Sequence, residues 1–564
     1  MLRTLLAIVL VPVAALLLWL AFGARSQRAD FVLACPEPRM LDPQRVSGLP
    51  EIQLVNAMFE GLTRLNADTF QPEPGVAEEW EVGDDQTRYT FHLREEARWS
   101  NGDPVVAEDF RCAWLRVLDP KAKSQYANLL FMIRGAQPFY TSRCNSDPAD
   151  DVAVEEVGIE VPENRTLRVT LCNPCSYFLD LTSFVTFYPA HRPTLAGWAY
   201  RDGRVLTGTE HLWTRPGNIV CNGAFVLTRW DFKQSIWLKR NPHYWDSATI
   251  GIDTIEAYIT DDVNVALIAY ETGRIDHARG LERGVAEVLM AEQKAGRRPD
   301  FSTGDRFATF FYRVNCRRPP LDDAHFRRAL SLAIDRVAIC EHVMRLGEAP
   351  ASTFVPRTVL HLMPRKSSDG ATIYYEPPAG LGVGLSAEQR GELAREHLRQ
   401  SGFDNSRAIE IASVADPEER FVAEAIQAMW ESVLGIQVAL RTIESKVLRS
   451  RISQLDYDVA RSNWFGDYMD PSTFLDMFVT EGGQNRTGWS NAEYDRLIAA
   501  AGAEADNVRR FSLFRAAERI LCEDELPIIP IYHRRGNYLF SPRFEPLQDN
   551  ARDILPIHRV RRRE

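Results

Sequence analysis

The stretch Val459-Ala-Arg-Ser-Asn-Trp-Phe-Gly-Asp-Tyr-Met-Asp-Pro471 decides how the rest of the chain is interpreted. It begins with apolar residues, as a strand does, and then places an arginine, large aromatics, a glycine and two aspartates before a proline. A strand that only fills a core alternates apolar and polar residues or stays apolar throughout. Charged groups at a buried strand end need charged or hydrogen-bonding partners. We therefore expect Asp467 to hold a cation and the backbone before it to hold another chain.

Length and composition indicate a globular protein of two or three domains. The chain has 564 residues, of which 45% are hydrophobic and 25% are charged, and a single core stops growing beyond about 250 to 300 residues. The net charge of -11 argues against a nucleic-acid partner, because phosphate binding needs concentrated lysine and arginine. The basic tail Arg559-Val-Arg-Arg-Arg563 is interpreted as a solvated terminus.

The N-terminal segment is predicted to be an export signal or a membrane anchor. An apolar run extends from Leu5 to Phe22 behind Arg3, and the polar stretch Arg25-Ser-Gln-Arg28 follows it. Its length lies between that of a signal-peptide core and that of a spanning helix, so length does not decide between the two. Both interpretations place residues 30 onward in the periplasm or another extracytoplasmic space, and the anchor would tether them to the membrane.

Nine cysteines leave at least one thiol unpaired, and two of them have redox spacing. Cys172-Asn-Pro-Cys175 follows a predicted strand over Leu167 to Cys172 and precedes a predicted helix at Tyr177. A catalytic dithiol of an exported thiol oxidoreductase is one interpretation. No thioredoxin-sized unit surrounds the motif, so a local disulfide between Cys172 and Cys175 is favoured.

No catalytic or metal-binding motif is found elsewhere in the sequence. The 11 histidines are scattered singly, and neither a Gly-x-Ser-x-Gly elbow nor a His-Glu-x-x-His motif occurs. Carboxylates are abundant, but without a base near a nucleophile or a metal they define no reaction. The chain is therefore predicted to be a binding protein and not an enzyme, with no cofactor and no metal.

Hydrophobic periodicity predicts an α/β fold. Apolar strand patterns alternate with amphipathic helix patterns, which implies parallel sheets with helical crossovers. The elements predicted with the strongest patterns are strand 31–35, helices 51–59 and 106–115, one long helix from Ala324 to Met344, helix 387–401, strand 408–414, helix 418–434 and strand 437–442.

Ordered motifs along residues 30 to 560 resemble the periplasmic oligopeptide-binding proteins of ABC importers, the family 5 type of extracellular solute-binding protein. These motifs are Leu41-Asp-Pro43, Phe59-Glu-Gly-Leu62, Pro74-Gly-Val-Ala-Glu-Glu-Trp80, Tyr89-Thr-Phe-His-Leu-Arg94, Trp99-Ser-Asn-Gly-Asp-Pro-Val105, Trp213-Thr-Arg-Pro-Gly-Asn-Ile-Val220, Asn222-Gly-Ala-Phe225, Lys239-Arg-Asn-Pro-His-Tyr-Trp245, Arg327-Arg-Ala-Leu330, Asp467-Tyr468 and Thr473-Phe-Leu475.

The resemblance implies a two-lobed fold of mixed sheets with an inserted domain, in which the chain crosses the hinge twice. Domain I would comprise residues 30–62, 173–305 and 535–564, domain II residues 63–172, and domain III residues 306–534. It also implies a monomer that captures an oligopeptide and delivers it to the permease subunits of an ABC transporter. Relatives of this fold bind other solutes, so a metal chelate or a sugar in the same cleft stays an alternative.

The same resemblance implies a set of ligand-binding residues. An extended peptide would add as a strand to both lobes, along Ser47, Gly48 and Leu49 on one side and Asn463, Trp464 and Phe465 on the other.

Charged residues would bind the two ends of that peptide. Asp467 would pair with its α-amino group, while Arg461, or Arg451 where the match slips by about one residue, would meet its carboxylate. Asp470 is interpreted as the cap of a helix that begins near Pro471.

Overall fold

The computed structural model describes residues 28–67, 69–144, 152–201, 203–209, 211–547 and 550–563. The predicted export signal or anchor, Leu5 to Phe22, lies outside the described residues. Within the ranges that are described, no helix is both long and apolar enough to cross a membrane.

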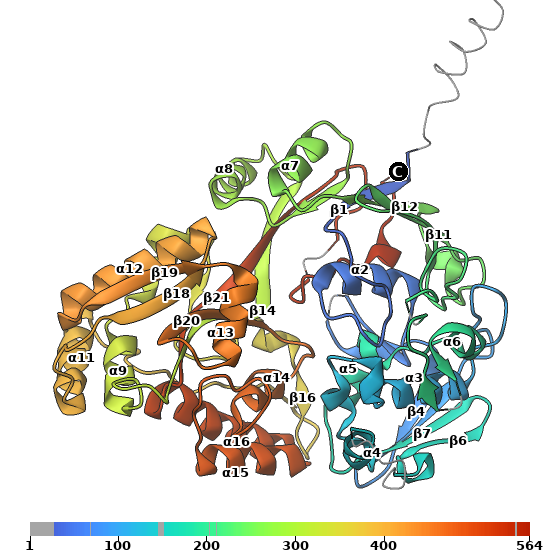
Figure 1. Cartoon of the computed structure of the whole chain (residues 1–564). Helices are drawn as coiled ribbons and strands as arrows, with labels where there is room; N and C mark the ends of the chain where they lie inside the picture. The colour runs from blue at the N-terminus through green and yellow to red at the C-terminus, as the bar shows by residue number, and fades with distance from the viewer. Residues whose placement is uncertain are drawn as a thin grey trace, which may run out of the picture.

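Two lobes lie on either side of a pair of long central strands (Figure 1). A single 11-stranded sheet runs through both lobes. Its path, neighbour by neighbour, is β10 (Phe225–Asp231), β11 (Ser235–Arg240), β12 (Thr254–Ile259), β1 (Phe31–Cys35), β13 (His277–Arg279), β21 (Ile528–Phe540), β14 (Phe301–Val314), β20 (Val459–Phe465), β18 (Ile409–Val414) and β19 (Val438–Ile443), with β15 (Ala349–Pro350) beside β21.

The central strands β14 and β21 carry the chain between the lobes. They pair antiparallel from Phe301 opposite Leu539 to Arg313 opposite Ile528. One end of β21 pairs with β13 in the first lobe, and the other end of β14 pairs with β20 in the second lobe. The predicted boundaries at 305/306 and 534/535 fall inside these two strands. The chain therefore crosses between the lobes twice.

The first lobe holds most of the N-terminal half of the chain around one continuous hydrophobic core. A four-stranded sheet, β4-β5-β7-β6, forms its lower part in Figure 1. The elements of this lobe outside the large sheet are α2 (Leu49–Met58), β2 (Thr63–Leu65), β3 (Pro72–Pro74), β4 (Ala77–Val82), β5 (Arg88–Leu93), α3 (Ala107–Val117), α4 (Ala136–Ser142), β6 (Ile159–Glu163), β7 (Thr166–Thr170), α5 (Phe178–Leu181), α6 (Arg192–Trp198), β8 (Tyr200–Arg201) and β9 (Arg204–Val205). Helices α7 (Val263–Glu271) and α8 (Arg283–Lys294) lie at the top of the view over a separate small core.

The second lobe is built on the parallel unit β18-α12-β19. Helix α12 (Pro417–Leu434) begins where the Asp416 side chain accepts a hydrogen bond from the Glu419 N–H, and it ends at Gly435, whose φ of 68° is left-handed. The predicted helices 387–401 and 418–434 and the two flanking strands are confirmed. The other helices of this lobe are α9 (Ala324–Leu332), α10 (Arg336–Ala338), α11 (Ala387–Ser401), α13 (Ser445–Ser453), α14 (Ser472–Leu475), α15 (Ala492–Ala503) and α16 (Asn507–Arg519), with a short hairpin of β16 (Arg365–Lys366) and β17 (Thr372–Ile373).

The prediction of one long helix from Ala324 to Met344 is wrong. Helix α9 ends at Leu332, and a second helical segment begins after Asp335, whose side chain accepts a hydrogen bond from the Ala338 N–H. The apolar spacing continues through the break because both segments pack on the same core. Periodicity reports which side chains are buried, and it misses a change of direction between two helices that share a core.

Candidate functional site

Strand β20 has one open edge over most of its length. On one side it pairs with β14 along all of its residues, from Val459 opposite Val314 to Phe465 opposite Ala308. On the other side it pairs with β18 only at Val459 and Ala460. From Arg461 to Phe465 no other strand of the described chain pairs with this second edge. An unpaired edge is a template onto which another extended chain can add.

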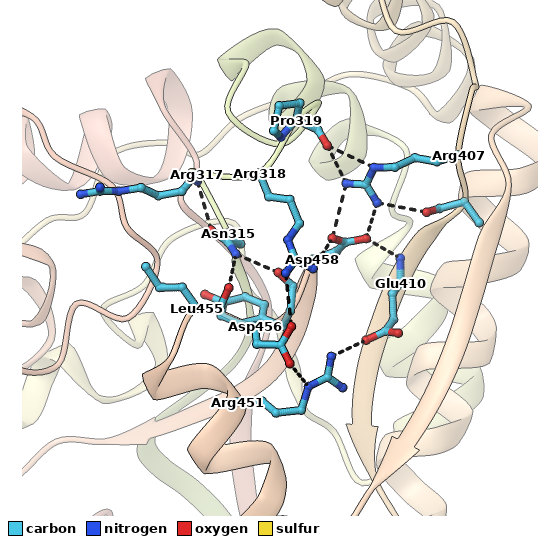
Figure 2. A network of polar contacts seen from close by, with 12 residues as sticks. Asn315, Arg317, Arg318, Pro319, Arg407, Glu410, Arg451, Leu455, Asp456 and Asp458 are labelled. Atoms are coloured by element: carbon cyan, nitrogen blue, oxygen red, sulfur yellow. Dashed lines mark hydrogen bonds and ion pairs between the residues drawn. The ribbon is translucent and has the colours of Figure 1, made fainter.

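A buried aspartate fixes the beginning of β20. Asp458 accepts hydrogen bonds from the Glu410 N–H at 3.1 Å and from an Arg318 Nη at 3.2 Å, and Arg407 forms an ion pair with it. Its own carbonyl accepts a bond from the Asn315 N–H at the end of β14. Figure 2 shows these groups converging on the Asp458 carboxylate. The network ties the start of β20 to both neighbouring strands, so the open edge has a defined position.

The predicted ligand residue Arg451 belongs to this same network. Its Nε donates to Asp456 at 2.9 Å and one Nη donates to Glu410 at 3.3 Å (Figure 2). These contacts lie at the beginning of β20, whereas Asp467 follows its end. A ligand role for Arg451 stays a prediction.

The backbone between β20 and Asp467 is held by close packing. The Gly466 N–H donates to the Phe307 carbonyl at 2.8 Å, and a Cβ at position 466 would lie 2.3 Å from the Phe307 ring. Only glycine fits there. Thr473 then fixes the flanking groups, because its Oγ1 accepts from the Asp467 N–H and its carbonyl accepts from Trp464 Nε1.

Asp467 meets groups that come from distant parts of the chain. The Tyr126 hydroxyl donates to Asp467 Oδ1 at 3.2 Å, and an Arg552 Nη donates to the Asp467 carbonyl at 2.6 Å. Burial raises the pKa of Asp467 to about 6. The carboxyl therefore lies in a desolvated position where a cation would stabilise its charged form.

Arg461 points from β20 toward α12. It forms an ion pair with Glu419 and lies over the Phe310 ring at 5.9 Å. Burial lowers the pKa of Arg461, so its guanidinium is poorly solvated and would gain from a second anion. Its predicted contact with a ligand carboxylate stays untested.

Ser47, Gly48 and Leu49 lie in the first lobe, at the beginning of α2, on the other side of the molecule's centre from β20 (Figure 1). Gly48 is extended, with φ -91° and ψ 145°, and Ser47 is exposed. A Cβ on Gly48 would lie 2.2 Å from Glu51 Oε2. The structure thus gives this glycine a local role, which is to make room for the Glu51 carboxylate, beside the predicted close approach of a ligand.

A buried loop anchor positions these three residues. Arg116 of α3 donates to Asp42 and to the Gln44 side chain, and all three are buried. The Asp42 carbonyl accepts from the Val46 N–H at 3.0 Å. The motif around Asp42 therefore shapes the loop that leads into α2.

An ion cluster between the lobes was missed from the sequence. Asp470 caps the first turn of α14 by accepting from the Ser472 N–H, as predicted, but it also binds Arg510 through both Nη groups, at 2.9 and 2.6 Å. Arg365 joins Asp470 at 3.3 Å to Asp180 of α5, in the first lobe, at 3.2 Å. All four charged side chains are buried. Nothing in the sequence around Arg365 or Arg510 signals this pairing.

Stacked tyrosines reinforce the same contact. The rings of Tyr177 and Tyr468 lie 4.6 Å apart at an interplanar angle of 10°. Tyr177 belongs to the first lobe and Tyr468 follows Asp467, so the segment that carries Asp467 packs directly on the opposite lobe.

The cysteines do not form the expected pair. All nine are unpaired, so the predicted local disulfide between Cys172 and Cys175 is wrong. Burial raises the pKa of Cys175 to about 12, the opposite of what a reactive thiolate needs. Among the described residues, no group of three metal-binding side chains is close enough to hold an ion.

Comparisons with known proteins cover both lobes. The model of the bacterial extracellular solute-binding proteins, family 5 Middle, matches residues 71–486. The chain is 32% identical over 496 residues to the dipeptide-binding protein DppE of Bacillus subtilis, covering 88% of this chain and 85% of that protein.

Solved structures match over nearly the whole chain. The murein tripeptide binding protein MppA of Escherichia coli gives a TM-score of 0.79 at 28% identity and covers 95% of this chain and 99% of its own. OppA of Haemophilus influenzae in complex with RPPGFSPFR gives a TM-score of 0.76 at 26% identity, and the match covers 95% of this chain and 99% of the OppA chain. The predicted two-lobed α/β fold is confirmed.

The Asp458 network provides a stability test. Asp458→Ala leaves Arg318 and Arg407 without their shared buried partner, and because both arginines are partly exposed we expect a loss of about 2 kcal/mol in the free energy of unfolding of the second lobe. Denaturant unfolding monitored by tryptophan fluorescence measures it. Asp456→Ala is the matched control: it removes an exposed carboxylate from the same network and should cost under about 0.5 kcal/mol. Equal losses in the two variants would contradict the anchoring role of Asp458.

Proposed function

Because this chain belongs to the bacterial extracellular solute-binding proteins of family 5, we propose that it captures extended oligopeptides between its lobes and delivers them to the permease of an ABC transporter. The observation that carries the proposal is the open edge of β20, which leads directly to the partly buried carboxyl of Asp467. An edge strand binds the backbone of any peptide, and a carboxyl at its end binds the one ammonium that every unblocked peptide has.

The two walls of the proposed site lie in different lobes. A peptide would add along Asn463, Trp464 and Phe465 of β20, with the loop Ser47–Leu49 as the opposite wall. Main-chain hydrogen bonds give affinity with little dependence on the peptide's sequence. Arg461 is the proposed partner of the carboxylate of a short peptide.

Closure of the lobes completes this site. The hinge consists of β14 and β21, and the Tyr126 hydroxyl reaches Asp467 across the gap. A ligand drives closure only to the extent that it binds the closed form more tightly than the open form. A peptide that contacts both walls at once satisfies this condition.

The remaining parts of the proposal concern organisation and location. We propose domain I as residues 30–62, 173–305 and 535–564, domain II as 63–172 and domain III as 306–534. Residues 1–29 would export the chain or tether it to the membrane, so that a monomer works in the periplasm or another extracytoplasmic space beside its permease.

Substitution of Asp467 tests the amine site. Asp467→Asn removes the charge that faces the ligand ammonium, so binding of an alanine pentapeptide should weaken at least about tenfold, which is 1.4 kcal/mol. The N-acetylated pentapeptide, which carries no ammonium, should lose much less. Isothermal titration calorimetry gives both values, and equal losses for the two peptides would show that Asp467 is only structural.

The pH dependence of binding gives a second test. The ammonium binds the ionised form of Asp467, whose pKa is raised by burial to about 6. Affinity for the unblocked pentapeptide should therefore be constant near neutral pH and fall as the pH drops through 6, approaching about tenfold per pH unit. The Asp467→Asn variant should lack this dependence. An affinity of the wild-type protein that is unchanged down to about pH 5 would contradict the assignment.

Backbone methylation of the peptide tests the strand edge. Replacing a peptide N–H by N–CH₃ removes a donor and adds bulk where the peptide meets β20, so methylation at alternate positions should weaken binding about tenfold or more. Methylation at the intervening positions, whose N–H groups point away from β20 and toward Ser47–Leu49, should have a smaller effect, because that wall is a loop and not a strand edge. A series without alternation would contradict strand addition at this edge.

A further inference from the structure

A ligand ammonium would add a second positive charge beside Asp467. The cation that faces the Asp467 carboxyl is Arg552, whose guanidinium also donates to the Asp467 carbonyl at 2.6 Å. Asp180 lies near Arg552 as well, but it is already hydrogen-bonded to Arg365 within the neutral four-residue cluster. A ligand ammonium at Asp467 therefore leaves two cations beside one carboxylate.

Arg552 has no direct ion-pair partner among the described residues, although the nearby Asp467 carboxyl favours its charged form. Among the described residues it forms no ion pair closer than 4.0 Å, and its planar face lies 5.7 Å from the Phe184 ring. Burial lowers the pKa of Arg552, which means that its charge is desolvated without full compensation. A partly buried cation in this position would be stabilised by an anion brought by the ligand.

A cavity of about 110 Å³ lies beside Arg552, and Asp467 is not among the residues that line it. Arg552 and Phe184 form part of its wall, with Asn56 of α2, Tyr188 and His558 among the other lining residues. Phe184 also packs edge-on against Tyr126, with their ring centroids 5.1 Å apart. The hydroxyl of Tyr126 is the group that donates to Asp467. The amine site and the cavity thus share a wall.

The other charged groups at the cavity are already neutralised. Glu60 lies 3.9 Å from Arg64 and also accepts hydrogen bonds from the Tyr244 hydroxyl and from Trp245 Nε1, both at 2.7 Å. Arg64 is paired with Glu73 and Asp246 as well. Burial lowers the pKa of His558 to about 4, so its ring is neutral at pH 7. Arg552 is therefore the cation that a ligand would meet in this cavity.

Resting on the proposed function, we propose that Arg552 makes the protein selective for peptides whose first residue has an acidic side chain, which enters this cavity. The ammonium of such a peptide pairs with Asp467, and its side-chain carboxylate, a few bonds away, pairs with Arg552. The planar guanidinium offers two parallel donors to a carboxylate. The ligand then brings one positive and one negative charge, which compensate the negative charge of Asp467 and the positive charge of Arg552.

Calorimetry with isosteric tripeptides tests the selectivity. Glu-Ala-Ala should bind the wild-type protein at least about tenfold more tightly than Gln-Ala-Ala, which has the same shape without the charge. In Arg552→Gln this ratio should fall to near one, because Gln-Ala-Ala binding is retained while Glu-Ala-Ala binding weakens. Arg552→Lys keeps the charge and should keep part of the ratio. Arg561→Gln, at an exposed arginine of the C-terminal segment, should leave it unchanged.

Each contrary result has a distinct meaning. Equal affinities for Glu-Ala-Ala and Gln-Ala-Ala in the wild type would overturn the inference and leave peptide binding standing. A uniform loss for both peptides in Arg552→Gln, with their ratio preserved, would show that Arg552 only supports the backbone at Asp467. If the wild-type protein prefers Ala-Glu-Ala over Ala-Gln-Ala by a larger factor than it prefers Glu-Ala-Ala over Gln-Ala-Ala, the assignment to the first residue is overturned. Binding of none of these peptides, nor of the alanine pentapeptide, would overturn the proposed function itself.

Discussion

The antiparallel pairing of β14 with β21 is the constraint on which the rest of the structure depends. These two strands are long enough to belong to both lobes, and each pairs with a further strand at its outer end. Because β14 pairs with β21 on one edge and with β20 on the other, the hinge and the strand with the open edge share β14. The position of the open edge of β20 is therefore set relative to the hinge itself.

Charge compensation organises the contact between the lobes. Asp470 and Arg510 are both in the second lobe, but Arg365 extends this pair to Asp180 in the first lobe. Separation of the lobes would break the contact between Arg365 and Asp180. Because burying these charges costs desolvation free energy, the ion pair adds only a small net stabilisation to the closed lobes. Asp467 is less fully compensated than Asp470. Its carboxyl meets a tyrosine hydroxyl and one nearby guanidinium, so it can accept a further cation.

Local patterns predicted the elements well and their junctions less well. Helix 387–401 and the β18-α12-β19 unit were predicted because capping residues and apolar spacing act within a few residues. The single helix from Ala324 to Met344 was wrong because two segments that pack on one core keep the same spacing. The disulfide between Cys172 and Cys175 was wrong because spacing in sequence says nothing of burial, and Cys175 points into the core of the first lobe.

The sequence by itself determined the class of protein, the α/β alternation and the special character of the stretch from Val459 to Pro471, since these follow from local composition and from the order of motifs. Only the tertiary structure decided which partners that stretch meets. Tyr126 and Arg552 lie far from Asp467 in sequence and reach it only in the folded chain. Electrostatic compensation acts through space, and a buried charge is stabilised by whichever residues the fold brings within a few ångströms of it.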